Sequence, residues 1–255
     1  FKNMGVKIEE DQNKIIIHGG GLNSLSPPTK EIYLGNSGTG ARLLIGLLAS
    51  QNFNSLLSGD LSLSSRPMSR IIDPLNLMGS EIIGNEGRLP LKIYGKKLKP
   101  INYTIPVPSA QVKSGLILAS LNTEGKSTIV EKNITRDHTE IMLESFGADL
   151  NIKKENNCKY ISIVGKKELT SKNIDVPSDL SSSSFFIVAA LINKNSNLLI
   201  KNININPSRD GILIALKKMG ANININNKRL LNNEIVADIL VSSSELNGCE
   251  LDEEM

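Results

Sequence analysis

One phrase of the sequence recurs four times at nearly constant spacing, and this repeat constrains the fold more than any other feature. Each copy has an apolar helical stretch, then methionine or phenylalanine before glycine, then alternating apolar residues. The copies are Met4-Gly5, Met78-Gly79, Phe146-Gly147 and Met219-Gly220, so the glycines lie 74, 68 and 73 residues apart. Glycine at a helix end adopts the left-handed conformation without a Cβ penalty, and alternation indicates strands. Each copy therefore predicts a helix end followed by a β-hairpin.

A second set of helices is expected to start about thirty residues before the helices that lead to Met78, Phe146 and Met219, with starts at Gly38-Thr39, Ser109 and Asp179. These helices are predicted over residues 41–48, 110–121 and 181–192. The unit is therefore strand, helix, strand, helix, hairpin, with a period near 70 residues. Common solenoid repeats have periods of about 20–50 residues. We therefore expect a pseudo-symmetric α/β architecture of the α+β type, and not an open superhelix.

Several local signals predict where the later helix of each unit begins. Pro67 suits the first turn of the helix that leads to Met78, and Pro74 inside it predicts a kink or a shortened start. Asp137 and Glu140 have the spacing of a capping box. Ser208 or Asp210 is expected to cap the helix that leads to Met219.

The repeat also predicts the domain organisation. Residues 1–18 supply only a helix end and its hairpin, so the first unit is incomplete. We expect a first domain over residues 1–175 and part of a second domain, one truncated unit, over 176–255. Residues 174–178 are interpreted as the crossover between them. The chain begins at Phe1 without methionine, and we expect it to be a fragment of a longer protein.

Composition excludes several classes of protein. The 29 Lys and Arg against 26 Asp and Glu give a formal charge of only +3, and there are 5 Phe, 4 Tyr and no Trp, which argues against nucleic-acid binding. Cys158 and Cys249 are too few for a disulfide scaffold and lack neighbours for a zinc site. The longest apolar stretches, such as 185–192, are far shorter than the ~20 residues of a membrane span. We expect a protein of a reducing, cytoplasmic compartment without a metal site.

Arginines stand at helix starts, where the macrodipole does not favour a cation. Arg42 lies in a first helical turn, and Arg66, Arg136 and Arg209 immediately precede helices. Arginine beside unpaired helix N–H groups is a good receptor for phosphate or carboxylate. The alternative for any single arginine is a solvated side chain, but repetition at equivalent positions favours the receptor.

Two further segments could bind an anion. The glycine-rich turn of residues 34–42 lets backbone N–H groups approach a ligand at Gly38, although it matches neither a Walker loop nor a dinucleotide fingerprint. Ser109-Ala110-Gln111 offers a hydroxyl, N–H groups and an amide at another helix start. The alternatives are an ordinary strand-to-helix turn and an ordinary serine cap. His138 is interpreted as part of a capped first turn and not as a catalyst.

Taken together, these motifs closely resemble the EPSP synthase family, the 3-phosphoshikimate 1-carboxyvinyltransferases. The resemblance covers essentially the whole chain in order, and it is specific only as a set. The matching segments are Leu34 to Thr39, Arg66-Pro67-Met68, Ser109 to Ser114, Thr135 to Glu140, Val176 to Asp179 and Asn206 to Gly211.

The resemblance implies a fold of two domains, each with three βαβαββ units in pseudo-threefold symmetry, an α-β prism. It implies transfer of the enolpyruvyl group from phosphoenolpyruvate to the 5-hydroxyl of shikimate 3-phosphate, by a monomer without a cofactor and with both substrates in the interdomain cleft. By matching position, Gly38, Arg66 and Gln111 contact phosphoenolpyruvate, and Arg66 and Gln111 are the catalytic candidates on this chain. Ser109, Ala110, Gln111 and Arg136 hold shikimate 3-phosphate.

Departures from the family limit what this chain is expected to do. The family's early Lys-Ser motif, its later catalytic Asp, its Lys-Glu-Ser-Asp-Arg stretch and its His-Arg pair are not found, so the chain alone is expected not to turn over. Family members that tolerate glyphosate often carry alanine at the position of Gly38. Glycine at this position therefore predicts that the intact enzyme is sensitive to glyphosate. The alternatives are a non-catalytic binder of phosphorylated ligands, an inert gene fragment and the UDP-N-acetylglucosamine enolpyruvyl transferase. RNA 3′-phosphate cyclase has related units but lacks a match to its adenylylation histidine here.

Overall fold

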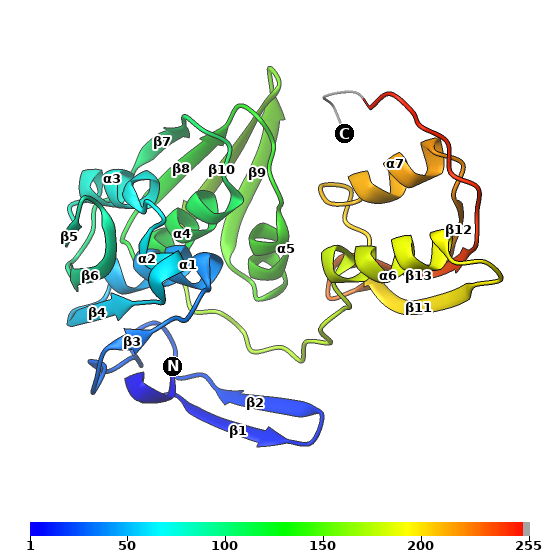
Figure 1. Cartoon of the computed structure of the whole chain (residues 1–255). Helices are drawn as coiled ribbons and strands as arrows, with labels where there is room; N and C mark the ends of the chain where they lie inside the picture. Colours follow the sequence, from blue (N-terminus) through cyan, green and yellow to red (C-terminus); the bar gives the residue numbers. More distant parts are fainter. Residues whose placement is uncertain (252–255) are drawn as a thin grey trace. The chain divides into compact units, whose positions relative to one another are not determined.

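The computed structural model describes residues 1–251, and the chain groups into two compact units (Figure 1). The first unit holds Phe1–Thr135 and Phe146–Ser171. The second holds Arg136–Ser145 and, of the described chain, residues 172–251. The domain boundary after residue 175 stays a prediction.

The first compact unit contains a hairpin followed by two four-stranded sheets with the same topology. The sheets have the orders β3-β4-β6-β5 and β7-β8-β10-β9, and in each the first pair is parallel and the others antiparallel. The hairpin is η1 (Lys2–Met4), β1 (Lys7–Asp11) and β2 (Lys14–His18). The elements of the first sheet and its helices are β3 (Ile32–Tyr33), α1 (Gly38–Ala49), β4 (Asn54–Ser58), α2 (Leu61–Ser64), α3 (Ser69–Leu77), β5 (Glu81–Asn85) and β6 (Arg88–Tyr94). Those of the second are β7 (Asn102–Ile105), α4 (Ala110–Leu121), β8 (Lys126–Glu131), β9 (Asp149–Glu155) and β10 (Cys158–Val164).

The second compact unit repeats this order around a three-stranded sheet, β11-β13-β12. Ser178 pairs in parallel with Ile203 of β11, which is the place that the parallel first strand has in the other sheets. Helices α6 and α7 pack on the strands, and α5 groups with this unit. The elements are α5 (His138–Ser145), α6 (Leu180–Ile192), β11 (Asn197–Asn204), α7 (Gly211–Lys218), β12 (Asn222–Leu231) and β13 (Glu234–Ser242). The predicted fold class is confirmed.

The four repeated glycines end helices in the left-handed conformation. Their φ angles are 86° at Gly5, 97° at Gly79, 78° at Gly147 and 90° at Gly220. Each is followed by an antiparallel hairpin, as the alternation predicted. A left-handed residue turns the chain sharply out of the helix, and this turn explains why one dipeptide marks every unit.

Two helix starts differ from the sequence predictions. Helix α3 begins at Ser69 and not at Pro67. Met68 is the N-cap, and its carbonyl accepts from the N–H groups of Ile71 and Ile72, whereas the carbonyl of Pro67 accepts from Arg42 Nη2 outside the helix. Asp210 is the N-cap residue of α7, but its side chain makes no cap hydrogen bond, and the hydroxyl of Ser208 donates to Asn206 Oδ1 instead.

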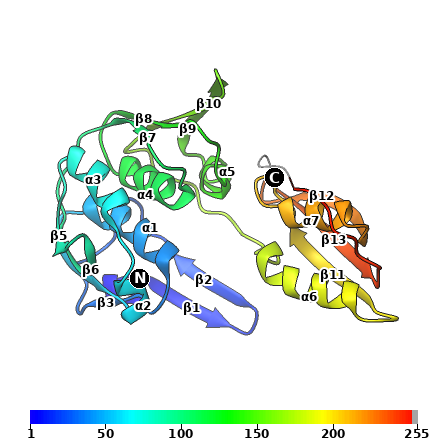
Figure 2. The ribbon, with the colours of Figure 1, turned by 45° about the horizontal axis from the view of Figure 1, so that its top comes forward.

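Helices of the first compact unit form the layer between its two sheets (Figure 2). Helix α1 packs on β4 and β6, α4 packs on β8 and β10, and the two helices pack on each other. Their contact is made by backbone, since a Cβ built on Gly46 would lie 2.0 Å from the carbonyl oxygen of Gly115. Helix α4 is buried on most of its sides, so its apolar residues spread around the helix, and Lys113, Ser114 and Ser120 are buried with them. This close approach brings the N-termini of α1 and α4 together.

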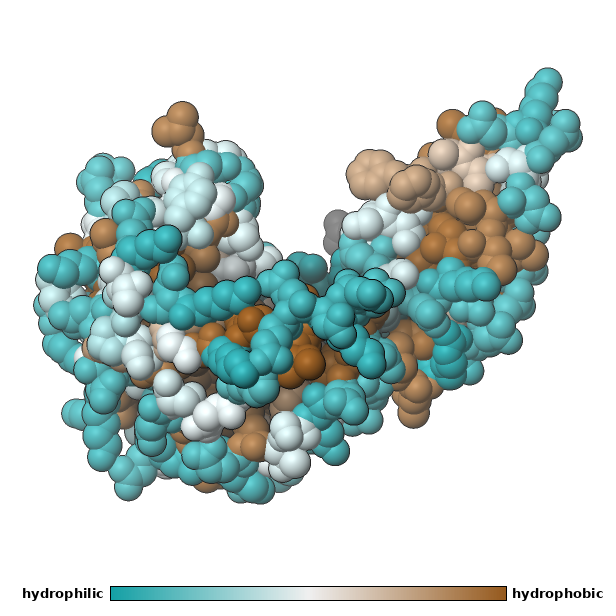
Figure 3. All heavy atoms as spheres, turned by 90° about the horizontal axis from the view of Figure 1, so that it is seen from below, coloured by the Kyte–Doolittle hydropathy of each residue, from teal (hydrophilic) through white to brown (hydrophobic). Residues whose placement is uncertain are grey.

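The surface carries exposed apolar side chains on several elements, among them Ile15 and Ile17 on β2 and Phe185 and Phe186 on α6. Figure 3 gives the hydropathy of one face of the molecule, where hydrophobic residues reach the surface in several places. Among the helices formed by residues 1–251, none has both the length and the apolar composition that a bilayer crossing requires.

Candidate functional site

The glycine-rich turn joins β3 to α1 and brings two arginines to the start of that helix. Ser37 is the N-cap, and its Oγ accepts a hydrogen bond from the N–H of Gly40 at 3.1 Å. Gly38 is buried, and a Cβ built on it would lie 3.0 Å from Arg66 Nη1 and 3.2 Å from Arg42 Nη1. A methyl group here would push both guanidinium groups away by a few tenths of an ångström, so glycine allows their closest approach to the helix start.

Arg66 is held by neutral oxygen atoms. Its Nη2 donates to Asn36 Oδ1 and, at 3.3 Å, to Ser62 Oγ. The amide of Asn36 in turn donates to Asp60 Oδ2 at 2.7 Å. Asp60 Oδ1 accepts from the N–H of Leu63, and this bond, the Asn36 amide and the charge of Arg66 lower the pKa of Asp60. Since an amide separates the carboxylate from the guanidinium, Arg66 forms no salt bridge with any residue of the described chain.

Arg42 links the turn to the N-terminus of α4. Its Nη1 donates to the carbonyl of Gly38 at 3.2 Å and to Gln111 Oε1 at 2.9 Å, and its Nη2 donates to the carbonyl of Pro67 at 3.1 Å. Gln111 Nε2 donates to Thr39 Oγ1 at 2.9 Å.

Positive charge is concentrated at this place. Burial lowers the pKa of Arg42, and the charges of Arg66 and Arg70 lower it further. Three guanidinium groups therefore influence one another beside two helix N-termini, which themselves favour an anion. The arrangement is suited to a ligand with more than one negative charge.

Ser109 and Ala110 form the start of α4. Ser109 is the N-cap, as predicted, and its Oγ accepts from the N–H of Val112 at 3.3 Å. A hydroxyl both accepts and donates, so this cap leaves the Ser109 proton available to a ligand. Ala110 is the first helical residue, and its small side chain leaves the helix start accessible.

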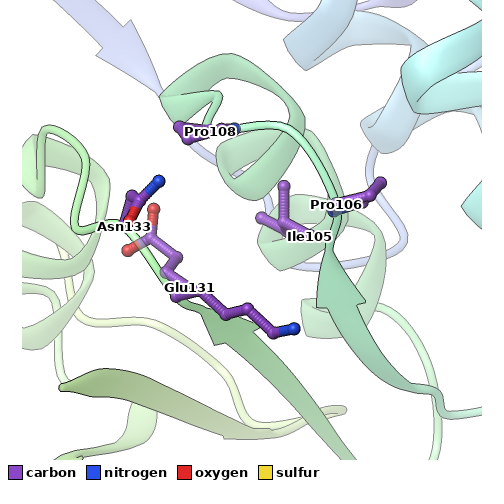
Figure 4. A pocket seen from close by; sticks show the side chains of 6 residues that line it. Ile105, Pro106, Pro108, Glu131 and Asn133 are labelled. Atoms are coloured by element: carbon purple, nitrogen blue, oxygen red, sulfur yellow. The ribbon is translucent and has the colours of Figure 1, made fainter.

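A pocket of about 180 Å³ lies at the carboxyl ends of the parallel strands β7 and β8, beside the segment that leads to Ser109 (Figure 4). Figure 4 shows the Glu131 carboxylate next to Asn133. Glu131 is buried and pairs with Lys113 Nζ at 3.1 Å, while the Thr135 hydroxyl donates to its other oxygen. The lining residues are Ile105, Pro106, Pro108, Glu131, Lys132 and Asn133.

The arginine before α7 differs from the arginine before α3. Arg209 Nη2 lies 2.9 Å from Asp179 Oδ1 and also donates to Ser181. Although burial alone would raise the pKa of Asp179, the hydrogen bonds from Ser182 and the charge of Arg209 lower it. The carboxylate of Asp179, the N-cap of α6, thus neutralises Arg209, whereas Arg66 binds the amide of Asn36, which precedes the N-cap of α1.

In the second compact unit, Arg136 precedes a segment that is held by a polar network. Asn206 Nδ2 donates to Asp137 Oδ1 at 2.9 Å and to Glu234 Oε2 at 3.2 Å. His138, the first residue of α5, has its Nδ1 2.6 Å from Glu234 Oε1. No local pattern in the sequence indicates these contacts, because their partners lie 28 to 96 residues apart.

Comparison with known proteins agrees with this geometry. The family model for EPSP synthase (3-phosphoshikimate 1-carboxyvinyltransferase) matches residues 1–252. The chain belongs to the EPSP synthase family. The 3-phosphoshikimate 1-carboxyvinyltransferase of Vesicomyosocius okutanii is 46% identical over 256 residues, and that of Caldicellulosiruptor saccharolyticus is 48% identical over 255. The alignments cover 100% and 99% of this chain and 58% of each relative.

A solved EPSP synthase from Acinetobacter baumannii has the same fold. It superposes with a TM-score of 0.86 at 45% identity, over 99% of this chain and 57% of that one. The chain thus spans little more than half the length of the EPSP synthases that it matches.

Most site residues expected from the EPSP synthase resemblance meet in the first compact unit. Gly38, Arg66 and Gln111 are joined through Arg42, while Arg136 is part of the second compact unit. Sequence reasoning treated Arg42 only as a helix-start arginine and did not find Asn36 or Asp60. The four-residue spacing from Gly38 to Arg42 was the available signal, since it places the side chain beside that carbonyl.

Proposed function

We propose that the protein to which this chain belongs transfers the enolpyruvyl group of phosphoenolpyruvate to the 5-hydroxyl of shikimate 3-phosphate. The products are 5-enolpyruvylshikimate 3-phosphate and phosphate. Family membership supports this proposal, and the observation that carries it is the arrangement of Gly38, Arg66 and Gln111 at two adjoining helix starts. We propose further that the protein acts as a cytoplasmic monomer.

Phosphoenolpyruvate is assigned to the turn at Gly38. Its phosphate and carboxylate are the groups that a planar guanidinium binds with two parallel hydrogen bonds. The oxygen of the 5-hydroxyl adds to C2 of phosphoenolpyruvate while C3 is protonated, which gives a tetrahedral phosphoketal. Loss of phosphate from C2 and of a proton from C3 then restores the double bond. Arg66 has a charge that no carboxylate cancels directly, so it would stabilise the developing charge without rearranging.

Shikimate 3-phosphate is assigned to Ser109, Ala110, Gln111 and Arg136. The N-terminus of α4 offers backbone N–H groups to the phosphate, and Ser109 adds a hydroxyl. Gln111 lies between this helix start and the turn at Gly38, so it would contact both ligands.

Calorimetric titration of the chain with each ligand tests this assignment. Arg66→Ala should weaken the binding of phosphoenolpyruvate at least about tenfold, because charge-assisted hydrogen bonds are the strong ones. Arg209→Ala is the matched control, since that arginine occupies the corresponding place before α7 but is neutralised by Asp179. It should leave the affinity unchanged.

Shikimate 3-phosphate is tested in the same way with Arg136→Ala and Ser109→Ala, both of which should lower its affinity. Equal affinities of the wild type and Arg66→Ala for phosphoenolpyruvate would refute the role of Arg66. A folded wild-type chain that binds neither ligand would refute the assignment of the sites to this part of the protein.

A further inference from the structure

We propose that Arg42 is a positioning residue. Its guanidinium fixes the orientation of the Gln111 amide and holds two turns together, the glycine-rich turn at Gly38 and the turn at Pro67, beside Arg66. This inference deepens the proposed function and rests on it for the identity of the ligands. Arg42 itself reaches protein atoms on three different segments: Gly38, Pro67 and Gln111.

The hydrogen bonds of Arg42 determine which way the Gln111 amide faces. A guanidinium only donates hydrogen bonds, so the atom of Gln111 beside Arg42 is its oxygen. The Nε2 group is then directed to Thr39 Oγ1, at 2.9 Å. Without Arg42, the amide could rotate and present either end to a ligand.

The same side chain ties the two turns to each other. Nη1 binds the carbonyl of Gly38 in the glycine-rich turn, and Nη2 binds the carbonyl of Pro67, next to Arg66. A planar fork holds these carbonyls in a fixed relation, which the single ammonium of lysine cannot do. Arg42→Lys therefore keeps the positive charge but cannot bind the carbonyls of Gly38 and Pro67 with the fixed spacing of a guanidinium.

Charge alone does not account for Arg42. Arg66 and Arg70 already supply positive charge, and they lower the pKa of Arg42. A third cation among them is electrostatically unfavourable unless its hydrogen bonds compensate. Three oxygen acceptors around one half-buried guanidinium provide that compensation.

The experiment observes the Gln111 amide directly by NMR. The chain has only three glutamines, Gln12, Gln51 and Gln111, so labelling with [15N]glutamine gives a small set of side-chain signals. In the wild type, the Gln111 amide hydrogens should show an NOE to Thr39. In Arg42→Lys, the Gln111 signals should move toward those of the exposed Gln12. Arg70→Lys is the control, and it should leave the Gln111 signals in place.

Binding provides the second measurement. Arg42→Lys should bind phosphoenolpyruvate and shikimate 3-phosphate each about tenfold more weakly, since Gln111 and both turns lose their fixed geometry. Unchanged Gln111 signals in a folded Arg42→Lys chain would overturn the proposal. Should that variant not fold, a wild-type amide without the NOE to Thr39 would overturn it. Because the NMR result needs no ligand, it stands or falls separately from the proposed function.

Discussion

Replacement of Gly46 by alanine should have two opposite effects on the stability of the chain: a gain in helix propensity and a steric clash with α4. Alanine within a helix is favoured over glycine by about 1 kcal/mol. The Cβ built on Gly46, however, lies 2.0 Å from the carbonyl oxygen of Gly115, and real Cβ contacts essentially never fall below 3.0 Å. Helices α1 and α4 must therefore separate by about 1 Å or more.

The free-energy cost of this steric overlap should exceed the gain from the higher helix propensity of alanine. The obstacle is backbone in the middle of a packed helix layer, so the cost lies near the upper end of overpacking, about 3 kcal/mol. After the gain of about 1 kcal/mol from propensity, we expect Gly46→Ala to lower the free energy of unfolding by about 2 kcal/mol.

Tyrosine fluorescence during urea unfolding measures this change in the correct part of the molecule. The chain has no tryptophan, and its four tyrosines all lie in the first compact unit. Gly19→Ala is the control, because a Cβ there has nothing within 4 Å. If Gly46→Ala proves as stable as the wild type, the helices do not touch through their backbones and the reasoning is refuted.

Three further predictions follow from the same contacts. Gly38→Ala should weaken phosphoenolpyruvate binding about tenfold in calorimetry, because the methyl group displaces arginine donors of strong hydrogen bonds; unchanged affinity would contradict the geometry of the turn. Glu131→Gln should destabilise the chain by about 3 kcal/mol in tyrosine-monitored urea unfolding, since Lys113 loses its carboxylate in a buried site, and a change below 1 kcal/mol, roughly the surface-pair value, would argue against burial. The pKa of Asp60 is lowered on folding, so its charge stabilises the chain above its ordinary pKa of 3.8 and this stabilisation is lost as the pH falls below that value. The urea midpoints of the wild type and Asp60→Asn should therefore differ at pH 6 and converge in acid, and a constant difference would exclude this cause.

The sequence predicted those parts of the fold that local chemistry determines. A glycine that must turn left-handed recurs at Gly5, Gly79, Gly147 and Gly220, and the cap serine or aspartate precedes its helix at Ser109 and Asp179. Such signals act within a few residues, so they can be read without the tertiary structure.

The remaining part of the site depends on contacts between distant residues. Arg42 and Gln111 are 69 residues apart, and Asn36 and Asp60 are 24 apart. Arg42 and Gln111 meet because Gly46 and Gly115 allow α1 and α4 to touch, and neither glycine differs from its neighbours in any local pattern. Asn36 and Asp60 meet because they follow the paired strands β3 and β4. The same limit explains the start of α3, because the carbonyl of Pro67 accepts from Arg42, which lies 25 residues earlier in the chain.

The contrast between Asn36 and Asp179 has a consequence for any fold built by repetition. Complete copies of the unit contribute helix starts that attract anions, and here three copies also carry an arginine before the later helix, at Arg66, Arg136 and Arg209. A charged metabolite would then distribute among several weak positions. Arg209 is beside a carboxylate and Arg66 is beside an amide, and this difference would favour an anion at Arg66 over Arg209. In a fold built from repeated units, selectivity for one ligand position therefore depends on neutralising the equivalent positions in other units as well as on the residues of the binding position itself.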